Sequence, residues 1–209
     1  MSIAFFPKAS TGEGIIQNGG VNAIVIDSSQ NVTIPQNLTV SGTLNSATGA
    51  VYPLVSGTAV ASTSGTSIDF TGIPSTAKRI TVMLAGVSTS GTSLPQIQIG
   101  SGSVTTSGYT ATASYGGTGN QVQTLTSGFV IVPGGAYSSA ASILSGAVTL
   151  LNISGNNWVS MGAISGQGGS SSSSSGVSPT LSGTLDRVRI TTVNGTDTFD
   201  AGSVNILWE

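Results

Sequence analysis

Apolar and polar residues alternate with a period of two in the last part of the chain, residues 183–209. The apolar positions of this alternation are Val188, Ile190, Val204, Ile206 and Trp208. A period of two is typical of strands with one buried face, and Asn194 and Gly195 between the two halves tolerate the positive φ of a tight turn. The pattern predicts a hairpin of two antiparallel strands. Because a hairpin cannot bury its apolar face alone, a second sheet or a partner chain must lie opposite it.

Similar alternation recurs from Leu54 onward, and no window shows the i, i+3, i+4, i+7 spacing of a helix. We expect strands at 58–61, 67–70, 79–87, 96–99, 104–112, 122–132, 141–153, 158–164, 185–193 and 199–208. This spacing predicts an all-β fold in which residues 51–209 form an antiparallel, jelly-roll-like β-sandwich. The serine-rich run 166–176 has no apolar anchor and is predicted to be a mobile loop. The repeated STSGTS segments at 62–67 and 88–93 are predicted to be loops at the ends of the sheets.

Very short apolar runs separated by turn residues characterise residues 21–44. Their apolar positions are Ile24, Ile26, Val32, Ile34, Leu38, Val40 and Leu44. Strands this short cannot form an independent core, so we expect three copies to bury them in a short intertwined β fibre segment, followed by a linker up to residue 50. Residues 1–20 lack a regular pattern, which predicts an N-terminal arm that docks onto a larger protein.

The composition limits the classes of partner. Charged residues make up 6% of the 209 residues, against about 25% in a typical soluble domain. Five cations are too few for a phosphate-binding surface, so we expect neither nucleic acid nor an anionic membrane as a partner. The apolar run 143–153 is too short to span a membrane, and the first residues lack the features of a signal peptide, so we expect synthesis in the cytoplasm.

Candidate catalytic groups are scarce because the chain contains neither His nor Cys. Asp197 and Asp200 flank the expected turn, where capping of the backbone is favoured over a calcium site or a glycosidase pair. Ser75 and Lys78 match a Ser-x-x-Lys pattern, but they lie between two predicted strands and not on a helix. We therefore expect no enzyme, no cofactor and no bound metal.

Two groups of residues remain as candidate contacts on the surface. Tyr109 and Tyr115 lie in a Gly-, Ser- and Thr-rich stretch that is predicted to be an exposed loop, so they are the candidate ligand contacts. The second group consists of Asp69, Arg79, Asp186, Arg187 and Arg189. We expect an ion-pair cluster from these charges, with contact to an anion or a sugar acid as the alternative.

Several segments resemble a β-rich module of fibre-type proteins from tailed bacteriophages. They are IDFTGIP at 68–74, KRITVM at 78–83 and the run 181–209, and the similarity covers residues 54–209. The segments IDSSQNVTIP at 26–35 and NLTVSGTL at 37–44 are similar to fibre shafts in which three chains intertwine.

The resemblance implies a structural protein on the virion exterior. We expect a homotrimeric tail fibre or spike that is attached through its N-terminal arm and touches a glycan on the host surface. The alternative is a capsid decoration protein or a head fibre. A carbohydrate-active enzyme and a free sugar-binding module are the interpretations from other classes.

Overall fold

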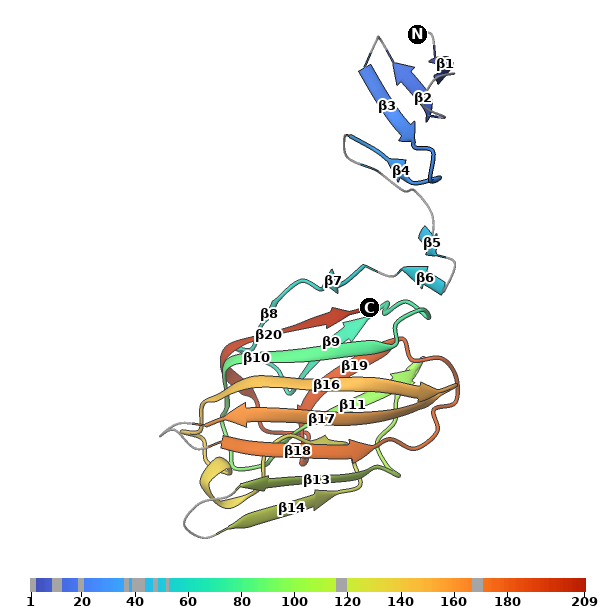
Figure 1. Ribbon diagram of the computed structural model, residues 1–209. Helices are drawn as coiled ribbons and strands as arrows, with labels where there is room; N and C mark the ends of the chain where they lie inside the picture. The colour runs from blue at the N-terminus through green and yellow to red at the C-terminus, as the bar shows by residue number, and fades with distance from the viewer. Residues whose placement is uncertain are drawn as a thin grey trace. The chain divides into compact units, whose positions relative to one another are not determined.

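A computed structural model describes residues 3–8, 13–18, 21–35, 38, 44–46, 49–51, 53–115, 120–166 and 171–209. The described residues form antiparallel strands and one short 3-10 helix, η1 (Gly135–Tyr137). The chain divides into two compact units, Met1–Tyr52 and Pro53–Glu209, and each is described by itself. The second unit is an antiparallel β-sandwich, which confirms the predicted all-β fold class (Figure 1).

Two sheets build the sandwich (Figure 1). The order in the large sheet is β14 (Gln121–Leu125), β13 (Thr110–Tyr115), β18 (Ser171–Val177), β17 (Asn157–Ser165), β16 (Leu144–Ser154), β10 (Arg79–Thr89), β20 (Phe199–Trp208) and β7 (Val55–Ser56), and β8 (Val60–Ala61) also pairs with β20. The order in the small sheet is β12 (Ser103–Val104), β11 (Pro95–Ser101), β19 (Arg187–Thr192) and β9 (Ser67–Thr71), with β15 (Phe129–Val130) on β11.

The core lies between the two sheets because alternate positions of their strands are buried. In the large sheet, Ile80, Val82 and Leu84 of β10 are buried, whereas the intervening residues are partly exposed. In the small sheet, Val188 and Ile190 of β19 belong to the same apolar cluster. Burial of one such side chain stabilises the fold by roughly 1.5 to 3 kcal/mol.

The two C-terminal strands lie where the sequence predicts them, but the predicted hairpin is wrong because they do not pair with each other. β19 and β20 lie in different sheets, and β20 pairs with β10 while β19 pairs with β11 and β9. The apolar face of each strand is therefore covered by the opposite sheet of the same sandwich. Alternation indicates which face of a strand is buried, but it does not distinguish a hairpin from a corner between two sheets.

The prediction of a mobile serine-rich loop is also wrong where the structure describes it. Residues 171–177 form β18, which pairs with β13 on one side and β17 on the other. The Ser172 hydroxyl is buried and lies 3.3 Å from the Ile164 carbonyl oxygen and 3.4 Å from that of Ile131. Serine has no strong preference for strands, so the two flanking ladders determine this conformation. Residues 167–170 of the predicted loop lie outside the described residues.

Other boundaries follow the predictions with local differences. The predicted strand 104–112 is divided between β12 and β13, and the predicted strand 122–132 between β14 and β15. Both STSGTS segments lie largely in loops at strand ends, and both contact the start of β20: the Phe199 amide donates to the Gly65 carbonyl, and the Ser90 amide donates to that of Thr198.

The first unit contains one antiparallel meander, β1 (Ile3–Lys8), β2 (Glu13–Asn18), β3 (Val21–Ile26) and β4 (Val32–Thr33), and a separate strand pair, β5 (Leu44–Ser46) and β6 (Gly49–Val51). The expectation of an irregular arm over residues 1–20 is wrong for the described part, because β1 and β2 pair along their whole length. The predicted linker 45–50 likewise contributes to β5 and β6. Of the short apolar run that contains Leu38 and Val40, the structure describes only Leu38, which is not in a strand.

Candidate functional surfaces

A turn centred on Asp27 connects β3 and β4 of the first unit. The Asp27 carboxylate accepts hydrogen bonds from the Ser29 amide and from the amide and side chain of Asn31, each at 2.9 Å. The hydrogen bond from the Asn31 side chain is the main cause that lowers the pKa of Asp27. The turn reverses the chain between β3 and β4, so that Ile26 lies opposite Val32.

Three apolar residues of the first unit, among those whose burial is described, are exposed on a single chain. The exposed fractions are 40% for Ile26, 60% for Val32 and 57% for Leu38, and Ile24 and Ile34 are half-buried. No side chain of this unit whose burial is described is fully buried, and the core cluster contains none of its residues. Val40 and the side chain of Leu44 lie outside the described residues. A layer with exposed apolar positions on neighbouring strands is suited to packing against other chains.

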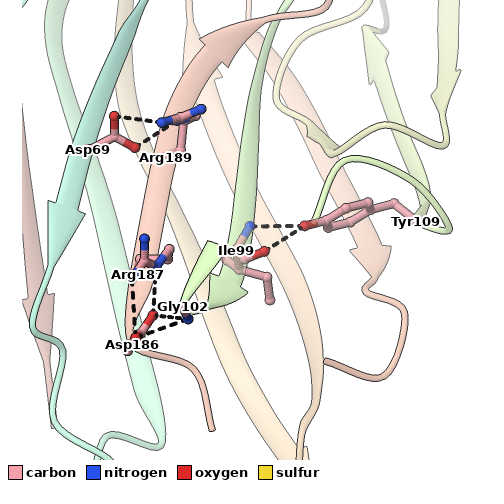
Figure 2. Close-up of polar contacts among 7 residues, drawn as sticks. All are labelled: Asp69, Ile99, Gly102, Tyr109, Asp186, Arg187 and Arg189. Carbon is pink, nitrogen blue, oxygen red and sulfur yellow. Dashed lines mark hydrogen bonds and ion pairs between the residues drawn. The ribbon is translucent and has the colours of Figure 1, made fainter. Parts of the chain in front are cut away.

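Ion pairs form among the expected charges, but Arg79 pairs with Glu209, which lies outside the expected group, so the charges do not make one cluster. Figure 2 shows two of the pairs on β19. Arg189 Nε and Nη2 donate to the Asp69 oxygens at 2.7 and 3.0 Å, and Arg187 Nε donates to Asp186 Oδ1 at 2.8 Å. The third pair joins Arg79 and the carboxylate of Glu209 at 2.7 Å.

The Asp186 pair also anchors a turn. The Gly102 amide lies 3.1 Å from both carboxylate oxygens of Asp186, as Figure 2 shows. The hydrogen bond from Arg187 lowers the pKa of Asp186, and the same contact raises the pKa of Arg187. Each pair is partly exposed, so solvent screens it and its contribution to stability is small.

The expectation that Tyr109 contacts a surface ligand is wrong, because 1% of Tyr109 is exposed. Its hydroxyl accepts from the Ile99 amide at 2.9 Å and lies 3.2 Å from the Ile99 carbonyl oxygen (Figure 2). The same hydroxyl lies 3.0 Å from the Thr105 carbonyl oxygen. Its ring packs edge-on against Phe129. Tyr115 is half-buried and packs against Tyr137 with ring centroids 5.9 Å apart, so its contact with a ligand stays a prediction.

The carboxylates of Asp197 and Asp200, in the 194–197 turn and at the start of β20, both accept hydrogen bonds from neighbouring residues. Asp197 accepts from the Asn194 side chain at 2.7 Å and from the Ser93 amide at 2.9 Å. Asp200 accepts from the Ser88 hydroxyl. Among the described residues no group of three or more acidic side chains could hold a metal ion. Ser75 lies in a turn between β9 and β10, so the Ser-x-x-Lys pattern lacks its helix.

Each sheet has a hollow on its outer face. The hollow on the large sheet has a volume of about 540 Å³, and small uncharged residues of β13, β16, β17 and β18 line it together with Met161. The hollow on the small sheet has a volume of about 320 Å³, and its lining includes Gln96, Gln98, Arg189 and Thr191. Of the two hollows, the one on the small sheet has the larger share of polar groups in its lining. The sequence pattern singles out Arg189 as a candidate surface contact, but not the two glutamines. Their alternation with Ile97 and Ile99 is the signal that places the glutamines on the face away from the core.

Comparison with known proteins adds no relative. No protein-family model, no curated protein and no solved structure matches the chain. In the part of the chain that the structure describes, no helix is long and apolar enough to cross a membrane. The features that bear on function are therefore the exposed apolar residues of the first unit and the hollows on the two sheets.

Proposed function

We propose that this chain is a structural protein of a bacteriophage virion, a homotrimeric tail fibre or spike whose sandwich contacts the host surface. The observation that supports this proposal is the row of exposed apolar side chains on the first unit, with Val32 60% exposed. The segments that resemble phage fibres include this row and β9, β10, β19 and β20 of the sandwich.

Assembly would remove an energetic penalty that a single chain carries. Ile26, Val32 and Leu38 are 40%, 60% and 57% exposed, so covering each of them is worth roughly half of the 1.5 to 3 kcal/mol of a full burial, and three chains contribute three such sets. A unit of about 50 residues buries a smaller fraction of its surface than a larger domain does, so its stability alone is marginal. Three copies around one axis would cover the apolar positions and would pair or cover exposed strand edges.

An intact-virion density map tests the proposed location. We expect threefold density that fits the sandwich at the end or side of the tail. Density on the head would support the alternative, a head fibre or capsid decoration protein. A particle that carries no density for this chain would contradict both.

A charge substitution tests the role of the apolar row. Val32→Asp should convert the trimer into monomers, because it would place a carboxylate inside the proposed interface. Val122→Asp is the matched control, because Val122 is 68% exposed on β14, outside the first unit. If both variants dissociate, or if neither does, the first unit is not the assembly interface.

We also propose that the chain is not an enzyme. Asp197 accepts a hydrogen bond from Asn194 and Asp200 accepts one from Ser88 of β10, and the chain has no His or Cys to act as a base or nucleophile. Purified protein should release no reducing ends from envelope polysaccharide. Release that is abolished by Asp197→Asn or Asp200→Asn would overturn this proposal.

A further inference from the structure

The outer face of the small sheet carries two rows of polar side chains that run across three strands. The first row contains Asp69, Arg189 and Gln98, and the second contains Ser67, Thr191 and Gln96. Directly opposed side chains in antiparallel strands lie about 5 Å apart, so the members of each row are neighbours on one face. The intervening residues of the same strands face the core.

A loop converts this face into a hollow. Gln98 Nε2 donates to the Ser127 carbonyl oxygen at 2.9 Å, and the Ser127 hydroxyl donates to Gln96 Oε1 at 2.7 Å. Although the two glutamines point away from the core, they are 2% and 6% exposed. A Cβ at Gly128 would lie 2.7 Å from Gln96 Oε1, so glycine permits this close approach of the loop. The glutamine amides are consequently held in fixed positions beneath the hollow.

The charges in this hollow are already compensated. Asp69 takes two of the five N–H groups of Arg189, and the other three have no partner among the described residues. Arg189 and Asp69 are each 36% exposed at the side chain, so solvent or a ligand can reach them. The site therefore offers donors and acceptors without a net charge, which suits hydroxyl groups better than it suits an anion.

We propose that this hollow binds a neutral saccharide. Each sugar hydroxyl both donates and accepts, which matches the guanidinium, amide and hydroxyl groups that line the hollow, with the Asp69 carboxylate paired to Arg189 at its edge. The volume of about 320 Å³ lies at the small end of ligand sites and suits about one or two sugar rings. This inference rests on the proposed contact of the fibre with a host surface.

The composition of the hollow also predicts weak binding at each site. No aromatic side chain lines it, so stacking on a sugar face does not contribute. We expect a Kd of about 1 mM or weaker for one site. Three linked copies would raise the effective affinity for a repeating surface glycan by avidity.

Saturation-transfer NMR on the full chain tests the inference. The neutral probes are the methyl glycosides of glucose, galactose and rhamnose, and the anionic probes are N-acetylneuraminate and inorganic phosphate. We expect transfer to at least one neutral glycoside and its loss in Gln98→Met, which keeps the side-chain volume but removes the amide. Thr149→Val is the matched control, because Thr149 lines the hollow on the other sheet and its substitution should leave transfer unchanged.

A charge variant separates a saccharide site from an anion site. Asp69→Asn leaves Arg189 without its counter-charge, which would strengthen the binding of phosphate at an anion site but should not strengthen the binding of a neutral glycoside. Absence of transfer to all neutral probes, transfer to the anions alone, or equal loss in Gln98→Met and Thr149→Val would each overturn the inference. The mass of the same sample is measured in parallel. A monomer that binds the glycoside contradicts the proposed trimer, whereas a trimer that does not bind contradicts the saccharide site.

Discussion

Replacing Tyr109 with phenylalanine removes one hydroxyl group from the interior of the sandwich. This hydroxyl accepts from the Ile99 amide at 2.9 Å, and Ile99 is fully buried. The Ile99 carbonyl keeps a bond from the Thr105 amide at 2.9 Å, but the Ile99 amide loses its acceptor. A buried donor without a partner costs about 1 to 3 kcal/mol. For a domain of this size we expect the Tm to fall by about 2 to 12 °C.

The same substitution should change the response to alkaline pH. Burial raises the pKa of Tyr109 from 10.0 to about 12. Because the folded pKa lies above the unfolded one, the stabilisation is complete below about pH 10 and is lost as the pH rises from 10 toward 12. Two pKa units correspond to a loss of about 2.7 kcal/mol at the end of this range. Tyr109→Phe has no phenol at this position and should lack this loss.

A thermal melt at pH 8 measures the change in Tm, and urea unfolding at a series of pH values between 8 and 12 measures the alkaline loss; both are followed by circular dichroism. Tyr115→Phe is the control, because it removes a hydroxyl from a half-buried tyrosine beside Tyr137. It should change the free energy of unfolding by no more than about 0.5 kcal/mol. Equal alkaline slopes for the wild type and Tyr109→Phe, or a Tm that does not change, would refute the reasoning.

Two further predictions concern the backbone and the ion pairs. Gly202→Ala should destabilise the sandwich by at least about 3 kcal/mol in urea unfolding, because Gly202 has φ +90° and a Cβ would lie 2.3 Å from the Gly86 carbonyl oxygen. Gly195→Ala, at φ +67° with no atom within 4 Å, should cost only about 1 kcal/mol, and equal losses would contradict this account. Asp186→Asn should remove a small part of the acid sensitivity, because the hydrogen bond from Arg187 lowers the pKa of Asp186 and its stabilisation is lost as the pH falls below about 3.8. If the free energies of unfolding of the wild type and Asp186→Asn differ by the same amount at pH 7 and at pH 2, the pair contributes nothing to the acid sensitivity.

The strands of the sandwich could be predicted from sequence because their apolar positions alternate. β20 was predicted with its observed bounds, and the buried faces of β10 and β19 follow the same alternation. The pairing of β19 and β20 could not be predicted, since a turn such as Asn194-Gly195 serves a hairpin and a corner between sheets equally well. β18 was missed because its seven residues, SSSSSGV, give no apolar signal, and its neighbours hold it in the sheet.

The candidate sites were harder to predict than the strands. A cluster of Asp69, Arg79, Asp186, Arg187 and Arg189 was expected from their charges, and the structure pairs four of these residues but joins Arg79 to Glu209. Tyr109 was misplaced because the Gly- and Ser-rich stretch around it resembles an exposed loop, whereas its ring and hydroxyl fill a position between β11 and Phe129. The role of Gln96 and Gln98 depends on Ser127, which lies about 30 residues away in sequence, and local patterns do not report such contacts.

The most direct test of the central claim is the mass in solution, by light scattering, of the full chain and of a shortened chain that begins at Leu54. The shortened chain keeps the core of the second unit but lacks the exposed apolar row of the first. We expect the full chain, 20.6 kDa as a single copy, to have three times that mass and the shortened chain to be a folded monomer. A monomeric full chain, or the same oligomeric state for both chains, would contradict the claim that the first unit assembles the protein.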